Sequence, residues 1–381
     1  MLPDKANDSM PVAKHLEQIV LVYDGDVESA LFNEDARDNC LQPEIVLRDE
    51  ALRSGFEMVG ADGEPSEKAV RIVHWDATIA AVLLRERHTL RGRLGALSRR
   101  LRGRTPAWHA YAEVPWDDER VVLILIEPPA ANPSSYDQRL LRQFHTVLTW
   151  DDELVDGARF QKYYLPLPDA PAVPADRVPF AAKRLCATIS ANKFSDHPAE
   201  LYSTRRKSIR YFEQRYPGQF DLFGVGWGES STHPSASAAD RSPYPSYRGT
   251  VECKTDTLKN YRFALCYENT DGPRGYVSEK IFDCLRADCV PVYLGAPNIG
   301  DYVDDAAFID RRQFPSDEAL AQFLESMEEQ EYMAYRLAAL RYLESEGFKR
   351  FLPDAFASTV LGALRIHGPA PVTPGRMQPQ T

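Results

Sequence analysis

The stretch from Tyr261 to Tyr302 constrains the fold of this chain more than any other segment. It begins with a short apolar run, Phe263 to Tyr267, of strand length and character, and a polar loop containing Gly and Pro follows. Ser278 is a favourable helix N-cap, and the apolar residues after it form one helical face. The run from Cys289 to Leu294 is typical of a buried parallel strand. The stretch therefore predicts a β-α-β unit.

The polar residues of this unit lie in the loop before the helix and in its first turn, where they suit an anion. A helix N-terminus presents free N–H groups and a partial positive charge. Lys280 adds a full charge, and Glu279 can bind vicinal sugar hydroxyls. The alternative is that Glu279 and Lys280 are ordinary surface residues without a ligand, although a lysine in the first turn opposes the helix dipole unless an anion is present. Tyr276 can simply be a residue that packs on the helix. The resulting hypothesis is a nucleotide or nucleotide-sugar site.

Length, charge and cysteine usage limit the class of protein. A chain of 381 residues predicts two domains, and a net charge of −11 argues against nucleic acid as the main partner. None of the six cysteines forms a CxxC pair, which favours buried thiols in a reducing compartment over disulfides. No signal peptide is evident, and no run approaches the ~18 apolar residues of a membrane span. We therefore expect a cytoplasmic protein.

Strands alternate with helices along the first half of the chain, as in a doubly wound α/β domain. The predicted strands cover 19–23, 56–59, 70–74, 121–126 and 144–150, with a helix over 40–54. The segment 165–179 is dense in Pro and Ala and predicts an interdomain linker. A second domain then begins with a strand at 185–189 and a helix at 204–214, and the chain ends in a Pro- and Gln-rich tail.

Two further residues are candidates for chemistry. Glu127 follows the strongest apolar strand and precedes two prolines, which places it at the carboxyl end of a strand, where α/β sheets bind ligands. It is either a capping or solvent-exposed acid, or a general base whose pKa is raised by apolar surroundings. Arg205 lies in a basic helix start and can equally be an ordinary surface arginine.

Motifs for metals and dinucleotides are weak. The triplet Asp24-Gly25-Asp26 can hold a divalent cation in some sugar transferases, but Asp and Gly also favour turns, which is the interpretation we prefer. The run Gly224 to Gly228 imitates part of a dinucleotide fingerprint, yet no helical pattern follows it. The histidines lack ligand spacing. We therefore predict no metal site.

The segment Arg85–Arg104 carries eight arginines, and its leucines at 90, 94, 97 and 101 fall at helical spacing. The interpretation we prefer is a solvated helix or loop face. The alternative is contact with an acidic acceptor glycan or with anionic lipid, which would place the protein peripherally at the inner face of the membrane.

The opening stretch resembles the donor-binding signature of the α-1,3/1,4-fucosyltransferases, especially of the bacterial branch. Three runs carry the resemblance: Tyr267-Glu268-Asn269, Tyr276-Val277-Ser278-Glu279-Lys280-Ile281-Phe282 and Cys289-Val290-Pro291-Val292-Tyr293-Leu294-Gly295-Ala296. The segments around Asp38, Glu127, Trp150 and Arg205 also resemble the family, so the likeness extends over most of the chain. Asp288 departs from it, because a small helix-ending Gly is usual there, and we expect that turn to be built differently. The arginine-rich segment has no counterpart that we can place.

The resemblance implies an α/β protein of the GT-B type, with two Rossmann-like domains facing a cleft. We expect residues 1–170 to form the acceptor-binding domain, 171–350 the GDP-fucose-binding domain, and 351–381 a C-terminal helix and flexible tail. It further implies GDP-fucose as donor, no required cofactor, inversion at the fucose, and an oligosaccharide or glycolipid acceptor with a lactosamine-type GlcNAc or Glc unit.

The resemblance also implies roles for individual residues. Glu127 would take the proton from the acceptor hydroxyl, and Arg205 and Lys280 would neutralise the diphosphate. Asn269 and Tyr276 would contact the phosphates or fucose, and Glu279 the ribose. Two rivals stay open at this point, a glycosyltransferase of this fold with another nucleotide sugar and a non-catalytic nucleotide- or glycan-binding module. Neither the 1,3 or 1,4 linkage nor the oligomeric state follows from the sequence.

Overall fold

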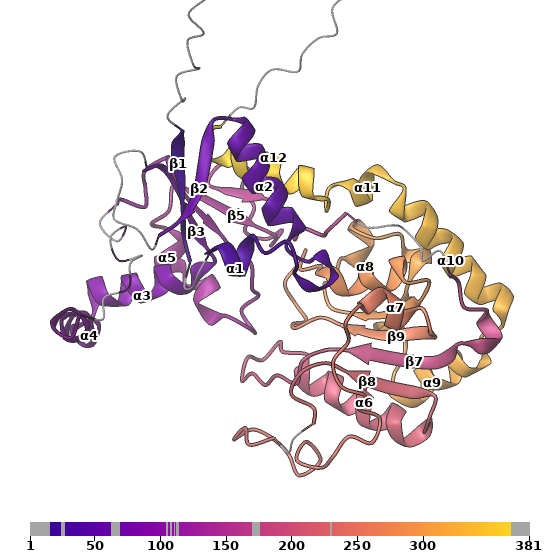
Figure 1. Cartoon of the computed structure of the whole chain (residues 1–381). Coiled ribbons are helices and arrows are strands. Elements are labelled where there is room, and N and C mark those ends of the chain that lie inside the picture. Colours follow the sequence, from indigo (N-terminus) through magenta and orange to yellow (C-terminus); the bar gives the residue numbers. More distant parts are fainter. Residues whose placement is uncertain are drawn as a thin grey trace, which may run out of the picture.

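Two parallel β-sheets with helices around them form the protein, which confirms the expected α/β class (Figure 1). The computed structural model describes residues 16–23, 27–61, 69–103, 106, 109, 111, 114–169, 176–228 and 231–366. The Asp24-Gly25-Asp26 triplet and the Pro- and Gln-rich tail lie outside these residues, as do residues 1–15. The predicted domain boundary at 170 does too, and it stays a prediction.

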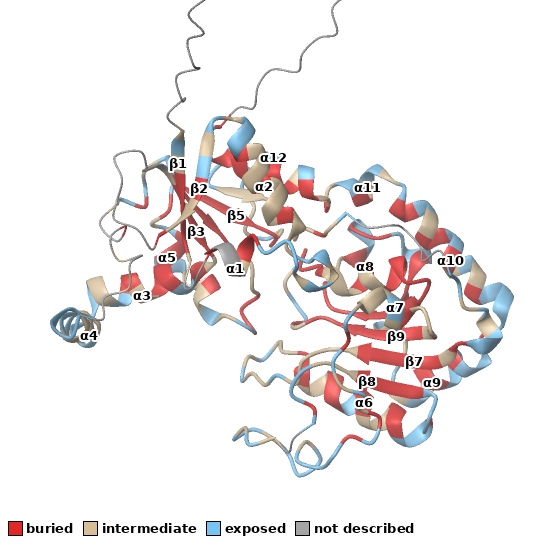
Figure 2. Cartoon of the chain, viewed as in Figure 1, coloured by how far each residue is buried: buried red, intermediate tan, exposed pale blue. Residues whose placement is uncertain are grey.

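The first sheet has the strand order β2-β1-β3-β4-β5-β6, and every pair is parallel. Its strands are β1 (Glu17–Val22), β2 (Phe56–Gly60), β3 (Ala69–Trp75), β4 (Val121–Ile124), β5 (Thr146–Thr149) and β6 (Phe160–Lys162). The helices of this half are α1 (Val27–Leu31), α2 (Gln42–Arg53), α3 (Ala77–His88), α4 (Leu90–Leu101) and α5 (Gln138–Leu141). All four residues of β4 are buried, as expected for a strand covered on both faces. Figure 2 shows the same for the labelled central strands of the other sheet, β7 (Arg184–Ile189) and β9 (Tyr261–Tyr267), which are largely buried.

The second sheet has the order β11-β10-β9-β7-β8 and is also parallel. Its strands are β7 (Arg184–Ile189), β8 (Phe220–Phe223), β9 (Tyr261–Tyr267), β10 (Val290–Leu294) and β11 (Ile309–Asp310). Its helices are α6 (Tyr202–Arg215), α7 (Lys254–Leu258), α8 (Glu279–Arg286), α9 (Asp317–Ser326), α10 (Glu329–Leu343) and α11 (Glu346–Lys349). The β-α-β unit predicted from Tyr261 to Tyr302 is β9-α8-β10. Both sheets share one doubly wound order, in which ligands bind where the strand order reverses.

The last helix, α12 (Pro353–Ala363), leaves the second domain and returns to the first, where it lies beside α2 (Figure 1). Phe356, Val360 and Leu364 are buried in one core with Leu47 and Ala51 of α2. The chain therefore crosses between the domains twice, and the return helix ties its end to the N-terminal core.

Asp152, in the turn after β5, joins the two domains through a polar cluster. Its carboxylate accepts hydrogen bonds from Lys162 of its own domain (2.7 Å) and from Tyr302 (2.6 Å) and Asn298 (2.9 Å) of the other. At Gly275, which has a φ of +88°, a Cβ would lie 2.5 Å from the carbonyl oxygen of Trp150. The loop before α8 is thus held against the N-terminal domain.

The turn after α8 is built around Asp288, the position where the family resemblance led us to expect a different turn. Its φ of 56° is the left-handed conformation that glycine favours. The side chain compensates, because the Asp288 carboxylate accepts hydrogen bonds from Arg336 (2.9 Å) and Lys183 (3.2 Å), both almost fully buried. The backbone is therefore the one a glycine would adopt, and the carboxylate serves as the counter-charge for two buried cations.

We expect Asp288→Gly to lower the free energy of unfolding by about 2–4 kcal/mol, because uncompensated buried cations cost more than the relieved backbone strain returns. Urea unfolding followed by circular dichroism measures the change. Asp288→Asn, which tolerates the same φ and keeps one acceptor, should lie between the two proteins. A glycine variant more stable than the wild type would show that the ion cluster does not stabilise the fold.

Candidate active site

A cavity of about 470 Å³ lies between the two domains, at the carboxyl ends of the central strands of the second sheet. Strand order reverses between β7 and β9, and residues just after both strands line the cavity, Ser190 and Lys193 after β7 and Asn269 after β9. The N-terminal domain contributes Glu44, Glu127 and neighbouring residues. The cavity therefore occupies the place where doubly wound domains bind ligands, with a second domain facing it.

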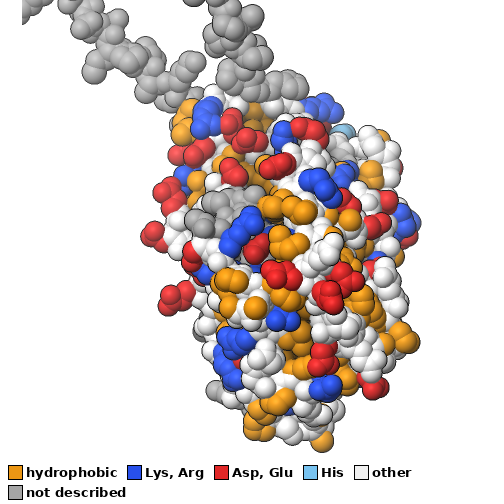
Figure 3. Space-filling model, turned by 90° about the vertical axis from the view of Figure 1, so that its right-hand side faces the viewer, with side chains coloured by type: hydrophobic (Ala, Val, Ile, Leu, Met, Phe, Trp, Pro, Cys, Tyr) orange, Lys and Arg blue, Asp and Glu red, His pale blue; other side chains and the backbone are white. Residues whose placement is uncertain are grey.

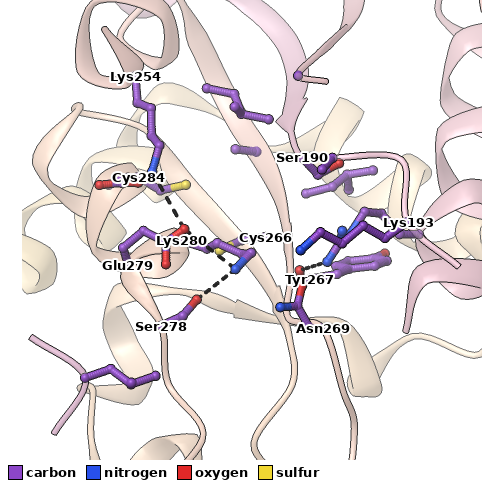
Figure 4. A pocket seen from close by; sticks show the side chains of 18 of the residues that line it. Ser190, Lys193, Lys254, Cys266, Tyr267, Asn269, Ser278, Glu279, Lys280 and Cys284 are labelled. Atoms are coloured by element: carbon purple, nitrogen blue, oxygen red, sulfur yellow. Dashed lines mark hydrogen bonds and ion pairs between the residues drawn. The ribbon is translucent and has the colours of Figure 1, made fainter. Parts of the chain in front are cut away.

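All six residues singled out from the sequence line this one cavity: Glu127, Arg205, Asn269, Tyr276, Glu279 and Lys280. In Figure 4, Ser278, Glu279 and Lys280 lie on one side of the cavity, and Lys193, Tyr267 and Asn269 lie on the other. The structure thus brings together residues that are more than 150 positions apart in the chain. Their chemical roles stay predictions.

Glu127 lies three residues beyond the end of β4, on the N-terminal wall. Its carboxylate makes no hydrogen bond or ion pair within the described part of the chain. Burial raises the pKa of Glu127, while the positive charges of Lys193 and Lys280 offset part of that increase. A half-buried carboxylate that faces a cavity without a partner can accept a proton from a ligand there.

Glu268 lies behind the opposite wall of the cavity, where it holds the lining residues Ser278 and Lys280, and we did not assign it a role from the sequence. It is fully buried, and its two oxygens accept hydrogen bonds from the backbone N–H (2.8 Å) and the hydroxyl (2.7 Å) of Ser278. Ser278 does stand at the N-cap of α8, but its hydroxyl bonds to Glu268 in place of the helix backbone. A Cβ at Gly295 would lie 2.5 Å from the Glu268 side chain, so this packing requires glycine there.

Lys280, in the first turn of α8, is oriented by this glutamate. Its ammonium lies 3.3 Å from a Glu268 oxygen and donates to the Ser278 hydroxyl at 3.0 Å. Burial by itself lowers the pKa of Lys280, but the carboxylates of Glu279 and Glu268 outweigh burial and raise the pKa. Lys280 therefore stays charged beside the N-terminus of α8. The ammonium group and the helix N-terminus both favour an anion at this position.

Arg205 on α6 supplies a second cation, and it is almost completely buried. Its Nη2 donates to the carbonyls of Tyr267 (2.6 Å) and Glu268 (2.8 Å), at the end of β9. Its Nε is buried without a hydrogen-bond partner among the described residues. The neighbouring Arg206 instead pairs with Asp240 at 2.9 Å, and Lys207 is exposed. Of the three basic residues at this helix start, Arg205 is thus the one with spare donor capacity in the cavity.

Glu279 and Lys254 form the polar edge of the same wall. A carboxylate oxygen of Glu279 lies 3.7 Å from the ammonium nitrogen of Lys254 and 3.7 Å from that of Lys280. Lys254 also forms an ion pair with Asp283 at 2.8 Å. Burial by itself raises the pKa of Glu279, but Lys280 and Lys254 outweigh it and lower the pKa. Glu279 is therefore an ionised acceptor whose side chain is 43% exposed, which suits hydroxyl groups of a ligand.

Tyr276 and Asn269 connect the wall to the N-terminal domain. The Tyr276 ring packs edge-on against Trp150, with 4.8 Å between ring centroids, and its hydroxyl accepts a hydrogen bond from Asn269 at 3.3 Å. From the sequence we also considered that Tyr276 packs on the helix. In the structure its ring instead packs on Trp150 of the N-terminal domain and so connects the two domains. Both side chains still line the cavity.

Sequence reasoning missed Glu44, Lys193 and Lys254 as well as Glu268. Lys193 follows the predicted strand 185–189, so the rule that pointed to Glu127 could have found it. Glu44, in the first turn of α2, has a buried oxygen without a hydrogen-bond partner among the described residues, and burial raises its pKa to about 7. Neither Glu44 nor Lys254 carries a local signal. Glu44 reaches the cavity through the contact between the domains, and Lys254 reaches it through the packing of α7 on α8.

Within the described ranges, no group of His, Cys, Asp and Glu side chains is arranged to hold a metal ion. The Asp24-Gly25-Asp26 triplet is not among these residues, so the prediction of a turn at that position is untested.

Comparisons with known proteins match the C-terminal domain most clearly. Residues 195–338 match the family model described as glycosyltransferase family 10 (fucosyltransferase) C-term. The α-(1,3)-fucosyltransferase FucT of Helicobacter pylori is 38% identical over 71 residues, 18% of this chain and 15% of that protein. α-(1,3)-Fucosyltransferase 7 of Rattus norvegicus is 28% identical over 206 residues, 51% of this chain and 46% of that protein. The matches thus span less than half the length of these relatives.

Among solved structures, an α1,3-fucosyltransferase with GDP has a TM-score of 0.51 to this chain at 13% identity, covering 95% of this chain and 94% of that one. Two Rossmann-like domains with a cavity between them and a structural neighbour of this kind define the GT-B class of glycosyltransferase fold. The C-terminal domain of the chain is thus similar to that of the fucosyltransferase family, and the curated relatives that it matches are α-(1,3)- and α-(1,4)-fucosyltransferases.

Proposed function

We propose that the protein transfers L-fucose from GDP-fucose, with inversion, to a hydroxyl of a GlcNAc or Glc unit in a lactosamine-type glycan. One observation carries the proposal. The interdomain cavity places Glu127, a carboxylate without a partner among the described residues, opposite a wall that holds two cations and a helix N-terminus. A base facing an anion-binding wall is what the displacement of a diphosphate by a hydroxyl needs. The family of the C-terminal domain supports fucose as the transferred sugar.

In the proposed reaction the acceptor oxygen attacks the anomeric carbon of fucose from the N-terminal side, while the bond from that carbon to the diphosphate breaks. Glu127 takes the acceptor proton, and GDP leaves with the bonding electrons. Lys280, Arg205 and the first N–H groups of α8 meet the charge that develops on the diphosphate. Glu279 would bind the ribose hydroxyls, and Asn269 and Tyr276 would contact the phosphates or the fucose.

The cavity also explains how the charge could be met without a metal ion. Lys280 and Arg205 are held by Glu268 and by the end of β9, so their positive charges are in place before the donor arrives. Such preorganised charges need no rearrangement during the reaction, which makes them effective in a water-poor site.

A donor and acceptor screen tests the proposal. We expect transfer from GDP-fucose to N-acetyllactosamine-type acceptors, unchanged by a chelator such as EDTA, with the linkage of the product read by NMR. Turnover with GDP-mannose or a UDP-sugar, and not with GDP-fucose, would instead establish a glycosyltransferase with a different donor. Binding of GDP with no transfer from any donor would favour a non-catalytic module.

A further inference from the structure

Helix α4 (Leu90–Leu101) presents a row of exposed leucines. Leu90, Leu94, Leu97 and Leu101 are 76%, 56%, 53% and 79% exposed. At 3.6 residues per turn these positions share one face of the helix. The helix projects from the N-terminal domain on the side away from the second domain (Figures 1 and 2). The four leucines therefore form an exposed apolar stripe far from the candidate active site.

The opposite face of α4 is fixed to the protein, so the orientation of the stripe is set. A Cβ at Gly92 would lie 2.2 Å from the carbonyl oxygen of Arg85, which shows how closely α4 approaches the end of α3. Arg99, half a turn away from the leucines, forms an ion pair with Glu86 of α3. The Thr89 hydroxyl caps the helix by accepting a hydrogen bond from Gly92 N–H at 2.9 Å. These contacts point the leucines outward.

Positive charge surrounds the leucine stripe. Arg91 and Arg100 are exposed and lie on its two sides, while the protein as a whole has a net charge of −11. The segment from 85 to 104 contains eight arginines and a single glutamate. By contrast, acidic and basic side chains are interspersed on the face that carries α10 (Figure 3). The α4 region is thus a concentrated cationic surface on an otherwise acidic protein.

We propose that α4 docks on the surface of an anionic lipid bilayer. An apolar stripe flanked by arginines is the pattern of helices that lie in a membrane interface, with the leucines among the upper acyl chains and the guanidinium groups at the headgroups. An acidic glycan would bind the arginines but leave the leucines in water. The leucines therefore favour lipid over glycan. Within the described part of the chain no helix has the length and apolarity to span a bilayer.

Flotation of the full-length protein with vesicles tests the proposal. We expect it to float with vesicles of phosphatidylcholine and phosphatidylglycerol, and to float poorly with phosphatidylcholine alone or at high salt. Leu94→Gln/Leu97→Gln keeps every charge and the helix propensity, and should lower partitioning roughly tenfold or more. Arg91→Gln/Arg100→Gln should lower it as well. The control is Leu337→Gln on α10, an equally solvent-facing leucine that is 52% exposed, which should change nothing.

Three outcomes would overturn the proposal. Absence of flotation with anionic vesicles excludes the lipid partner. Equal partitioning of wild type and the leucine variant would show that only charge is recognised, as for an acidic polysaccharide. Self-association of the wild type that the leucine variant abolishes, without flotation, would make the stripe a contact between two copies of the chain. Circular dichroism and transfer to a soluble acceptor should be unchanged in the leucine variant, because α4 does not line the cavity.

Discussion

Replacing Glu127 by Gln should lower the rate of fucose transfer by roughly 10²–10⁴-fold, the usual contribution of a general base, while GDP still binds. The amide keeps the size and shape of the side chain but cannot take a proton from the acceptor hydroxyl. Glu127 lies on the N-terminal wall and forms no hydrogen bond or ion pair with the described residues of the anion-binding wall, so donor affinity should change little. Steady-state rates and calorimetric titration with GDP measure the two effects separately.

Glu44 provides the matched control, because it is the second carboxyl group that the N-terminal domain contributes to the cavity. Glu44→Gln should leave most of the transfer rate intact. The pH profile adds an independent check. A base works only when deprotonated, so the transfer rate should decrease as the pH is lowered through the pKa of Glu127. Because burial raises this pKa, the decrease should be centred above pH 4.5, the ordinary pKa of a glutamate. If the transfer rate instead decreases around pH 7 and Glu44→Gln abolishes this decrease, the general base is Glu44, whose pKa is about 7.

The sequence predicts the parts of this site that depend on strand order and helix ends. Carboxyl ends of parallel strands meet at one edge of a sheet, and a helix that follows such a strand begins there, so Asn269 and Lys280 had to lie together. Arg205 needed the family resemblance, because its helix starts with three basic residues and the sequence does not tell which of them faces the cavity. Glu268 was overlooked although it stands in the recognised signature. A glutamate next to an apolar strand gives no sign that its partners, Ser278 and Lys280, lie ten and twelve residues further on.

Features created by contact between the domains could not be predicted in this way. The polar cluster at Asp152 and the packing of Tyr276 on Trp150 both depend on how the two sheets face each other. No local pattern in 353–363 tells that α12 packs on α2, because an apolar helix face fits either core. Two strands, β4 and β5, were also predicted too long. Glu127 was placed directly after a strand ending at 126, whereas β4 ends at Ile124 and leaves the carboxylate on a short loop at the cavity.

Replacing Lys280 tests the anion-binding wall, because Lys280 both faces the cavity and contacts Glu268 and Ser278. Lys280→Ala should lower kcat/KM for GDP-fucose by roughly 10²–10³-fold, the loss expected when one preorganised charge is removed from a transition state. It should also lower the free energy of unfolding by roughly 2–4 kcal/mol, because the fully buried Glu268 carboxylate would lose its cationic partner. The two losses have different causes, and a second substitution separates them.

In the double variant Lys280→Ala/Glu268→Gln the buried charge is neutralised, while the Gln carbonyl can still accept the hydrogen bond from Ser278 N–H. Thermal stability should therefore recover most of the way to the wild-type Tm, and transfer should stay at the low level of Lys280→Ala. Lys207→Ala, which removes an exposed lysine on α6, should affect neither property. If the double variant regains transfer together with stability, Lys280 serves the fold and not the diphosphate. If the stability of Lys280→Ala equals that of the wild type, then the hydrogen bonds from Ser278 suffice to hold the Glu268 carboxylate. Lys280 then binds ligand without stabilising the fold.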